Sequence, residues 1–143
     1  MMKSKAKFTL VFILGCLLTA LSAAAQSKAM TKTFKLGNLE VAEKDLSTGS
    51  YSKTFEEAKK GCAELGEDWR LPTPSELDTL FKYKDKINIR FGTYWSSQEY
   101  NFNINDLVYA YAWGKLFTTG AKYFYHVKDQ LYARPVKTIN TAK

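Results

Sequence analysis

WRLPTPSEL, residues 69–77, is the stretch of sequence that decides the fold. Its second half carries a capping box, because the Thr73 hydroxyl can accept from the backbone at Glu76 while the Glu76 carboxylate reaches back to the Thr73 amide. Pro74 then takes the first helical position, where its missing N–H costs nothing. Apolar residues at 77, 80 and 81 supply one buried stripe. The pattern predicts a helix that begins at residue 74.

Another helix is predicted directly upstream. Thr54 and Glu57 form a second capping box, and Gly66 is suited to end the helix that it opens. The apolar side chains at helical spacing are Phe55, Ala58, Cys62 and Leu65. Because Cys62 lies on this apolar face, we expect it to be a structural thiol in the core.

The second half of the chain changes to strand patterns. Strands are predicted at 94–97, 107–117, 123–127 and 131–136, and the three residues between the last two are consistent with a hairpin. A shorter hairpin is predicted over residues 34–41, around the turn pair Gly37-Asn38. Two helices followed by a strand-rich half indicate an α+β domain.

Arg70 is flanked by apolar residues at 69, 71 and 72. A guanidinium near a core needs a carboxylate, because an unpaired buried charge is strongly destabilising. Glu76 or Asp78 could serve, so we interpret Arg70 as a structural clamp between this loop and the second helix. The alternative is an anion-binding Arg beside the free backbone donors of a helix N-terminus.

The N-terminus carries the three-part pattern of a secretion signal. Three lysines lie within residues 3–7, an apolar run covers 8–21, and small residues follow at Ala23 and Ala25. We expect cleavage after Ala25, so that residues 1–25 are a signal peptide and the mature protein lies in the periplasm or outside the cell. The apolar run is shorter than the ~20 residues of a membrane span. We therefore expect no membrane insertion after cleavage.

Cys16 lies in Ile13-Leu14-Gly15-Cys16, which loosely resembles a lipoprotein processing site. Leu14 is too large for its position and more apolar sequence follows the cysteine, so lipidation is not expected. Without the signal, Cys62 is the single cysteine, and no internal disulfide can form.

Cleavage of 25 of the 143 residues leaves 118, a normal length for one domain. We expect a flexible leader at 26–33, a domain at 34–138 and a tail at 139–143. The net charge falls from +7 to +4, because three lysines leave with the signal. The remaining basic residues are spread along the chain, which argues against nucleic acid as a partner. An acidic polymer stays open as a ligand.

Aromatic residues Tyr109, Tyr111 and Trp113 alternate with small residues along the strand predicted at 107–117. A period of two places the three rings on one face. One interpretation is that the rings belong to the core, or to a cross-strand ladder with Tyr123 and Tyr125.

The other interpretation is a platform on which a sugar ring or a peptide stacks, with Lys115 and nearby Asn side chains as hydrogen-bonding partners. The stretch from Glu99 to Asp106 is predicted to be a long loop beside this strand, because Asn stabilises turns. The candidate ligand-binding residues are Asn101, Asn103, Asn105, Asp106, Tyr109, Tyr111, Trp113 and Lys115.

The same loop offers oxygen ligands at alternate positions, as a calcium site would. It lacks the central glycine and the closing Glu of an EF-hand loop, so an Asn-rich connection is the favoured interpretation. We expect no metal or cofactor.

The sequence holds no convergent catalytic set. Ser96, Ser97, His126 and Asp129 contain the atoms of a hydrolase triad, but the serines lack the glycines of a nucleophile elbow. An apolar helix face raises the pKa of a thiol, so Cys62 is a poor nucleophile. We predict that the protein is not an enzyme.

Four motifs in this order are similar to those of a known family. They are the helix at 55–65, the WRLPTPSEL segment, Tyr94-Trp95-Ser96-Ser97-Gln98-Glu99 with Phe117-Thr118-Thr119-Gly120, and the closing Ala133-Arg134-Pro135-Val136-Lys137. Residues 36 to 137 resemble a bacterial family of domains of unknown function related to the C-terminal domain of the Legionella collagen-like adhesin. The resemblance implies a C-type-lectin-like fold, akin to the formylglycine-generating-enzyme superfamily, with two helices on a twisted, mainly antiparallel sheet and long loops.

Seven residues of these motifs are expected to be structural rather than ligand-binding. These are Cys62, Trp69, Arg70, Pro72, Glu76, Trp95 and Arg134. Family members often carry a closing-strand Cys that can pair with the helix Cys, and this chain has Ala133-Arg134-Pro135 there. The formylglycine-generating relatives use paired active-site cysteines, which this chain does not have. Because sulfated polysaccharide binding is associated with the adhesin, we expect a monomeric, exported module that binds glycan or an acidic polysaccharide at the cell envelope. The alternative is a structural or protein-interaction module of the envelope.

Overall fold

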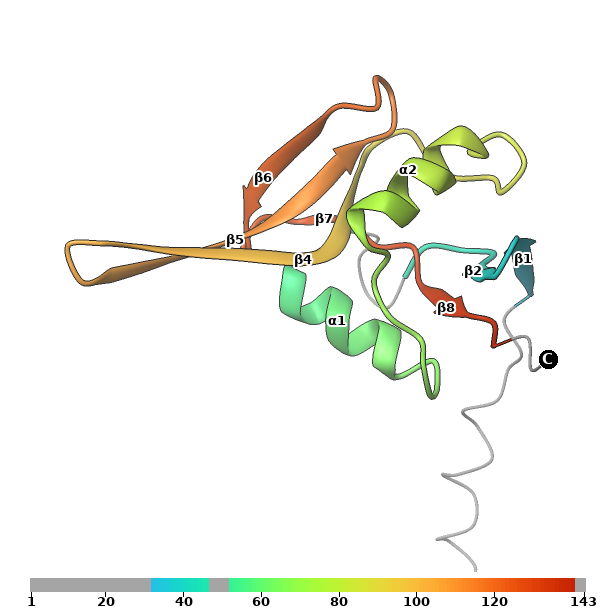
Figure 1. Ribbon diagram of the computed structural model, residues 1–143, viewed down its shortest axis with the longest axis horizontal. Coiled ribbons are helices and arrows are strands. Elements are labelled where there is room, and N and C mark those ends of the chain that lie inside the picture. The colour runs from blue at the N-terminus through green and yellow to red at the C-terminus, as the bar shows by residue number, and fades with distance from the viewer. Residues whose placement is uncertain (1–31, 47–51, 141–143) are drawn as a thin grey trace, which may run out of the picture. The chain divides into compact units, whose positions relative to one another are not determined.

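The computed structural model describes residues 32–46 and 52–140. Figure 1 shows the elements in chain order. They are β1 (Thr33–Leu36), β2 (Leu39–Ala42), β3 (Ser52–Lys53), α1 (Phe55–Ala63), α2 (Pro74–Lys82), β4 (Thr93–Ile104), β5 (Leu107–Leu116), β6 (Lys122–His126), β7 (Leu131–Tyr132) and β8 (Val136–Thr138). The expected signal peptide, leader residues 26–31 and tail residues 141–143 lie outside the described residues.

The strands form two sheets, one in the order β1-β2-β8 and one in the order β3-β7-β4-β5-β6. Neighbouring strands are antiparallel, except that β4 and β7 meet in parallel at Tyr94 and Tyr132. Two helices with two mostly antiparallel sheets confirm the predicted α+β class. No helix among the described residues is long and apolar enough to cross a membrane.

Both helices begin where their capping boxes predict. Thr54 and Thr73 are the N-cap residues, and in each box the side-chain oxygen accepts from the amide three residues on while that Glu reaches back to the cap amide. Pro74 takes the first turn of α2, as expected. Each capping box joins residues only three apart, so it fixes the start of its helix independently of what the helix packs against.

The larger sheet separates two apolar clusters, and adjacent residues of β4 point into different ones. Trp95 lies in a cluster with Phe55 and Cys62 of α1, whereas Tyr94 lies in a cluster with Leu77 and Leu80 of α2. Successive side chains of a strand point to opposite faces. α1 therefore covers one face of the sheet and α2 covers the other.

The predicted strand at 131–136 is wrong in extent, because it divides between the two sheets. β7 pairs with β3 and β4, and β8 pairs with β2 in the other sheet. Pro135 has no amide to donate to a ladder, and the Arg134 side chain turns into the interior with 1% of its area exposed. The hairpin predicted at 34–41 is present as β1 and β2, with Gly37 at a φ of 62° in the turn.

The expected loop from Glu99 to Asp106 is also wrong. Residues 99–104 continue β4 and pair with 107–112 of β5, leaving a turn of two residues, Asn105 and Asp106, both at positive φ (49° and 64°). This geometry is typical of a tight hairpin turn, which Asn and Asp tolerate well. The Asn residues at 101 and 103 alternate with apolar residues, which is a strand pattern rather than a loop pattern.

The WRLPTPSEL corner is bonded to β8, and its Leu71 lies in the apolar cluster of α1. The Arg70 amide donates to the Val136 carbonyl at 3.0 Å, and the Val136 amide donates back at 2.9 Å. Arg70 Nη1 and Nη2 donate to the two Glu76 oxygens at 2.7 and 2.9 Å. The corner is therefore part of the folded body.

Candidate binding surface

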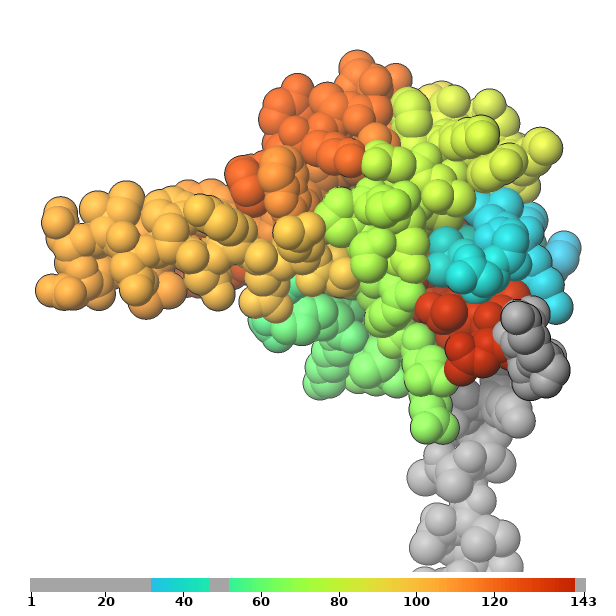
Figure 2. Space-filling view, in the orientation of Figure 1, coloured from blue at the N-terminus to red at the C-terminus, as the bar shows by residue number. Residues whose placement is uncertain are grey.

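The hairpin of β4 and β5 has one apolar face, formed by directly paired residues. The pairs are Tyr100 with Tyr111, Phe102 with Tyr109, and Ile104 with Leu107. Trp113 and its partner Phe124 on β6 continue the same face. We call these eight residues the aromatic face. Figure 2 shows the hairpin, in orange, projecting beyond α1 and β6.

Ring contacts order this face. The Phe102 ring lies between Tyr109 and Tyr111, with centroid distances of 5.3 and 5.5 Å and interplanar angles of 13° and 17°. The Trp113 and Phe124 centroids are 3.8 Å apart. The cross-strand ladder therefore exists, but its β6 member is Phe124 and not the predicted Tyr123 or Tyr125, which lie on the opposite face with Gly114 and Ala112.

The core interpretation of Tyr109, Tyr111 and Trp113 is wrong. None of them belongs to either apolar cluster, and all three are half-buried. The small residues alternating with them face the core instead, where Ala112 packs in the α1 cluster. At Gly114 an added Cβ would lie 2.8 Å from the Tyr125 ring, so the close approach requires glycine.

The aromatic face stays open toward the tip of the hairpin. Leu107 exposes 61% of its surface, Tyr100 53%, Ile104 51% and Phe124 44%. Between Tyr100 and Gly114 the sequence holds a single charged residue, Asp106. This exposed apolar surface makes the hairpin a candidate interaction site.

Lys115 does not contribute to this surface, contrary to the prediction. It is 5% exposed, and its Nζ donates to Asp78 Oδ1 at 2.8 Å and to the Gly120 carbonyl at 2.7 Å. It points to the same side of the sheet as Trp113, but α2 covers that side here. Burial favours a higher pKa for Asp78, yet the hydrogen bonds from Lys115 and Lys122 outweigh it and lower that pKa.

The polar residues predicted to bind a ligand do not lie on the aromatic face. Asn101 and Asn103 alternate with the aromatic residues of β4, so their side chains lie on the opposite face with Glu99 and Val108. Asn105 and Asp106 form the turn. Donors spread along an extended strand do not surround one point, and the described residues contain no group of three or more His, Cys, Asp or Glu able to hold a metal.

The triad atoms are not arranged as a triad. Ser96 is fully buried, and its Oγ accepts from the Gln98 amide. Asp129 accepts from the backbone amide of His126, while His126 Nδ1 accepts from the Lys128 amide. Cys62 is buried beside Ala133 in the α1 cluster, and burial raises the pKa of its thiol to about 12.

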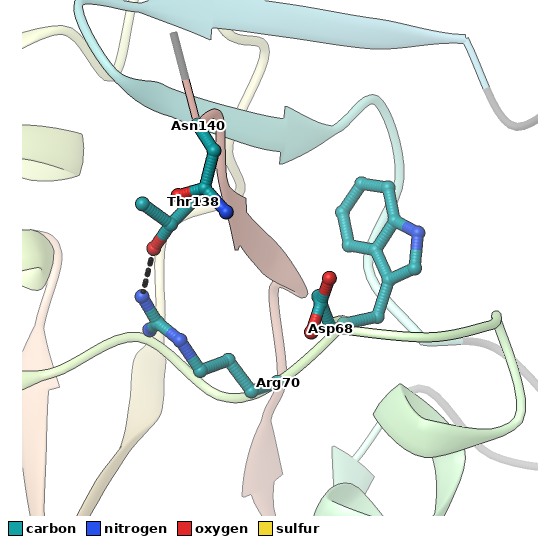
Figure 3. A pocket seen from close by; sticks show the side chains of 5 residues that line it. Asp68, Arg70, Thr138 and Asn140 are labelled. Atoms are coloured by element: carbon teal, nitrogen blue, oxygen red, sulfur yellow. Dashed lines mark hydrogen bonds between the residues drawn. The ribbon is translucent and has the colours of Figure 1, made fainter. Parts of the chain in front are cut away.

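The residues interpreted as structural lie in or against the interior. Pro72 and Trp95 are buried, and the Trp95 indole donates to the Lys53 carbonyl at 2.7 Å. Trp69 packs under the Lys137 ammonium at 5.2 Å. Asp68, Trp69, Arg70, Thr138 and Asn140 line a depression of about 250 Å³. Figure 3 shows that Arg70 there donates to Thr138, so its guanidinium is engaged by Thr138 and Glu76, as a clamp requires.

The sequence patterns do not predict a basic groove that lies beside α2. It encloses about 510 Å³ and is lined by Lys35, Leu36, Gly37, Thr79, Tyr83 and Lys86. The Tyr83 ring lies between the ammonium groups of Lys82 and Lys86, at 5.6 and 5.5 Å. The groove lies between the β1–β2 turn and the end of α2. These segments are distant in the sequence, so no local motif predicts that they meet.

Comparison with solved structures defines the class. EMS16, an antagonist of the collagen receptor integrin alpha2beta1 (GPIa/IIa), superposes with a TM-score of 0.55 at 11% identity, covering 74% of this chain and 96% of EMS16. Identity at that level shows the fold alone, and the fold is C-type-lectin-like. The chain belongs to the Lcl C-terminal domain family, whose profile matches residues 21–137. No curated protein matches the sequence.

Proposed function

We propose that this protein is an exported, non-enzymatic binding module that docks another protein on the aromatic face. One observation carries the proposal: eight aromatic or aliphatic residues are contiguous on one face, beside His126, whose ring contacts Tyr111 at 5.5 Å, and most of them lie on a hairpin that extends beyond its neighbouring strands. A two-stranded ribbon is marginally stable in water by itself. A partner that covered the open face would remove apolar surface from water and stabilise the ribbon.

A protein partner fits this face better than a sugar. Sugar sites combine apolar rings with polar groups aimed at the same point. Here Lys115 is buried against Asp78, and the Asn side chains of β4 lie on the opposite face. Phe102 is also stacked between two tyrosines, which leaves less ring surface free for a sugar.

The N-terminal pattern supports export. Its basic start, apolar run and Ala-x-Ala end are those of a cleavable signal, so the partner would be met in the periplasm or at the cell surface. We also propose that the protein is not an enzyme, which is supported by a buried Cys62 and by Asp129, which accepts from the backbone amide of His126 rather than from its ring.

Leu107 and Val108 offer a matched test. They are neighbours on β5, expose 61% and 69% of their surfaces, and point to opposite faces. A photo-crosslinking amino acid placed at each position in cells that export the protein should capture a defined protein from position 107 and not from 108. Equal capture at both positions, or no capture at 107, would contradict docking on the aromatic face.

The basic groove favours a second candidate, an acidic polysaccharide. Lys35 and Lys86 line the groove and Lys82 borders it. Sulfated glycans arrayed at low and moderate salt should bind the wild type, with binding that weakens as salt rises. The double change Lys35→Glu and Lys86→Glu should abolish that binding, whereas Lys60→Glu on α1 should not. Glycan binding that survives the groove change would remove this candidate.

A further inference from the structure

The outer edge of β4 is occupied along its first part and open along the rest. β7 pairs with β4 at Tyr94, and the Ser97 amide donates to the Pro72 carbonyl at 2.8 Å. From Glu99 to Ile104, β4 pairs with β5 on its inner side, and no described residue pairs with its outer side. Figure 1 shows this free edge along the projecting hairpin.

The turn fixes which backbone groups face outward. Ile104 and Leu107 flank the two-residue turn and so form a hydrogen-bonded pair. Hydrogen-bonded and non-hydrogen-bonded pairs alternate along antiparallel strands. Glu99, Asn101 and Asn103 therefore direct their N–H and C=O groups away from β5. The same alternation turns the Ala110 carbonyl away from β4, and it accepts from the Val127 amide at 3.2 Å.

We propose that the outer edge of β4 from Glu99 to Asn103 accepts an extended segment of the partner protein as an added strand. The proposal rests on the proposed function and specifies how the partner is held. Strand addition satisfies the six outward backbone groups and widens the aromatic face at the same time.

The size of the face argues against a second copy packed face to face. Six residues of strand span about 20 Å and two strands about 10 Å, roughly 200 Å² in plan. A stable interface needs about 800 Å² from each partner. The uneven surface made by the side chains adds too little area to reach that value. A partner therefore needs hydrogen bonds to the hairpin in addition to contact with its face.

The edge also defines the chemistry of the added segment. Side chains beside Tyr100, Phe102 and Ile104 would lie on the aromatic face and must be apolar. Those on the other face would lie near Asn101, Asn103 and Glu99, whose carboxylate is bound to Lys59 at 3.0 Å. Lys59 also binds Glu56 at 3.2 Å, so one ammonium is shared by two carboxylates on that face. The fitting partner is a segment that alternates apolar and polar residues.

Proline provides a selective test, because a strand edge tolerates it where the amide faces outward. The variant Asn101→Pro with Asn103→Pro loses two outward donors and keeps the amides that face β5. Its control, Asn101→Ala with Asn103→Ala, loses the same side chains and keeps the donors. Near-unchanged β4–β5 amide signals in NMR spectra would establish that the proline variant keeps its hairpin.

The probe is a displayed library of random twelve-residue segments, selected on the purified wild-type protein. Selected segments should alternate apolar and polar residues, and adding one as a peptide should slow amide exchange at Glu99, Asn101 and Asn103. The proline variant should bind it about tenfold or more weakly, as expected for two lost hydrogen bonds, while the alanine control stays within about twofold. Failure to select alternating segments, or equal binding to the proline variant, would overturn strand addition.

The variant Leu107→Asp distinguishes strand addition at the β4 edge from docking on the aromatic face. If Leu107→Asp abolishes binding of the selected peptide and the proline variant does not, the aromatic face is a docking surface and the β4 edge is not. If neither change weakens binding, both proposals fail.

Discussion

Arg134 Nε donates to Asp45 Oδ1 at 2.7 Å, and both side chains are almost completely buried, at 1% and 2% exposure. The other guanidinium nitrogens donate to the carbonyls of Ala42, Glu43, Ile87 and Asn88. Asp45 also accepts from the Tyr94 hydroxyl at 3.0 Å, and burial raises the pKa of Tyr94. One buried ion pair thus ties β2, the segment after α2 and β4 to the segment between β7 and β8.

Replacing Arg134 with Met should destabilise the protein by about 3 kcal/mol, the low end for breaking a buried pair, because Asp45 loses its buried charge partner and keeps the half-exposed Arg90 guanidinium at 3.7 Å. The free energy of unfolding in urea measures the loss. Arg134→Met combined with Asp45→Leu should recover part of it, since both charges are then removed. A double variant no more stable than the single one would show that the carbonyl contacts of Arg134, and not its charge partner, carry the effect.

Glu76 should make stability depend on acid pH. Burial favours a higher pKa for Glu76, but the hydrogen bonds from Arg70 and the Thr73 amide outweigh it and hold the pKa below the ordinary 4.5. The folded state therefore binds this proton less readily than the unfolded chain. The stabilisation is complete above pH 4.5 and is lost as the pH falls through the lowered value.

Glu76→Gln tests this dependence. The variant should be less stable by about 1 kcal/mol at neutral pH, a modest figure because Arg70 is partly exposed and solvent screens the pair. The difference from wild type should shrink in acid. Glu64→Gln, at the exposed C-cap of α1, is the matched control and should show little difference in stability from wild type. If Glu76→Gln lowered the free energy of unfolding by the same amount at neutral and acid pH, the Glu76 charge would be excluded as the source of the effect.

Cys62 should be unreactive in the folded protein. With a pKa of about 12 the thiol carries almost no thiolate at pH 8, and its side chain has no exposed surface. Iodoacetamide followed by mass spectrometry should label the mature protein only after urea is added. Rapid labelling without urea would mean that α1 opens readily from the sheet.

Lys115→Met should reduce stability without changing partner binding. Its loss removes the buried bonds to Asp78 and Gly120, although Lys122 still pairs with Asp78 at 2.6 Å. Thermal unfolding and peptide binding, measured on the same preparation, separate the two effects. Weakened binding with unchanged unfolding would restore Lys115 to the binding site predicted from the sequence.

Gly114→Ala should destabilise the sheet by about 1–3 kcal/mol, the usual cost of overpacking. The added methyl would meet the Tyr125 ring at 2.8 Å and Leu131 at 3.1 Å. Urea unfolding measures the loss. Combining Gly114→Ala with Tyr125→Leu should restore part of the lost stability. If the double variant is no more stable than Gly114→Ala, the strain does not arise from the Tyr125 ring.

The parts of this fold that the sequence predicted rest on short-range chemistry. Both capping boxes span four residues, and the Arg70–Glu76 clamp joins residues six apart, with Asp78 as the alternative partner that instead binds Lys115. The alternation of Tyr109, Tyr111 and Trp113 correctly placed three rings on one face. Each of these signals can be interpreted without knowing the tertiary arrangement.

The errors arise where distant segments meet. Lys115 has the same strand parity as Trp113, and only the position of α2 above the sheet decides that one is buried and the other is not. The pairing of Asp45 with Arg134 joins residues 89 apart, and the groove between Lys35 and Lys86 depends on how α2 lies against the β1–β2 hairpin. The loop prediction for residues 99–106 is wrong because their two-residue apolar–polar period outweighs the turn propensity of Asn.

The two-residue turn at Asn105 and Asp106 limits the lengths that the hairpin can take while keeping its aromatic face on the same side. Inserting one residue into each strand would send Ile104 and Leu107 to the opposite side, because a strand reverses its faces at every residue. Inserting two into each would preserve the faces and lengthen the arm by about 7 Å. Relatives with arms of different reach should therefore differ by even numbers of residues per strand, and a designer can extend the arm by the same rule.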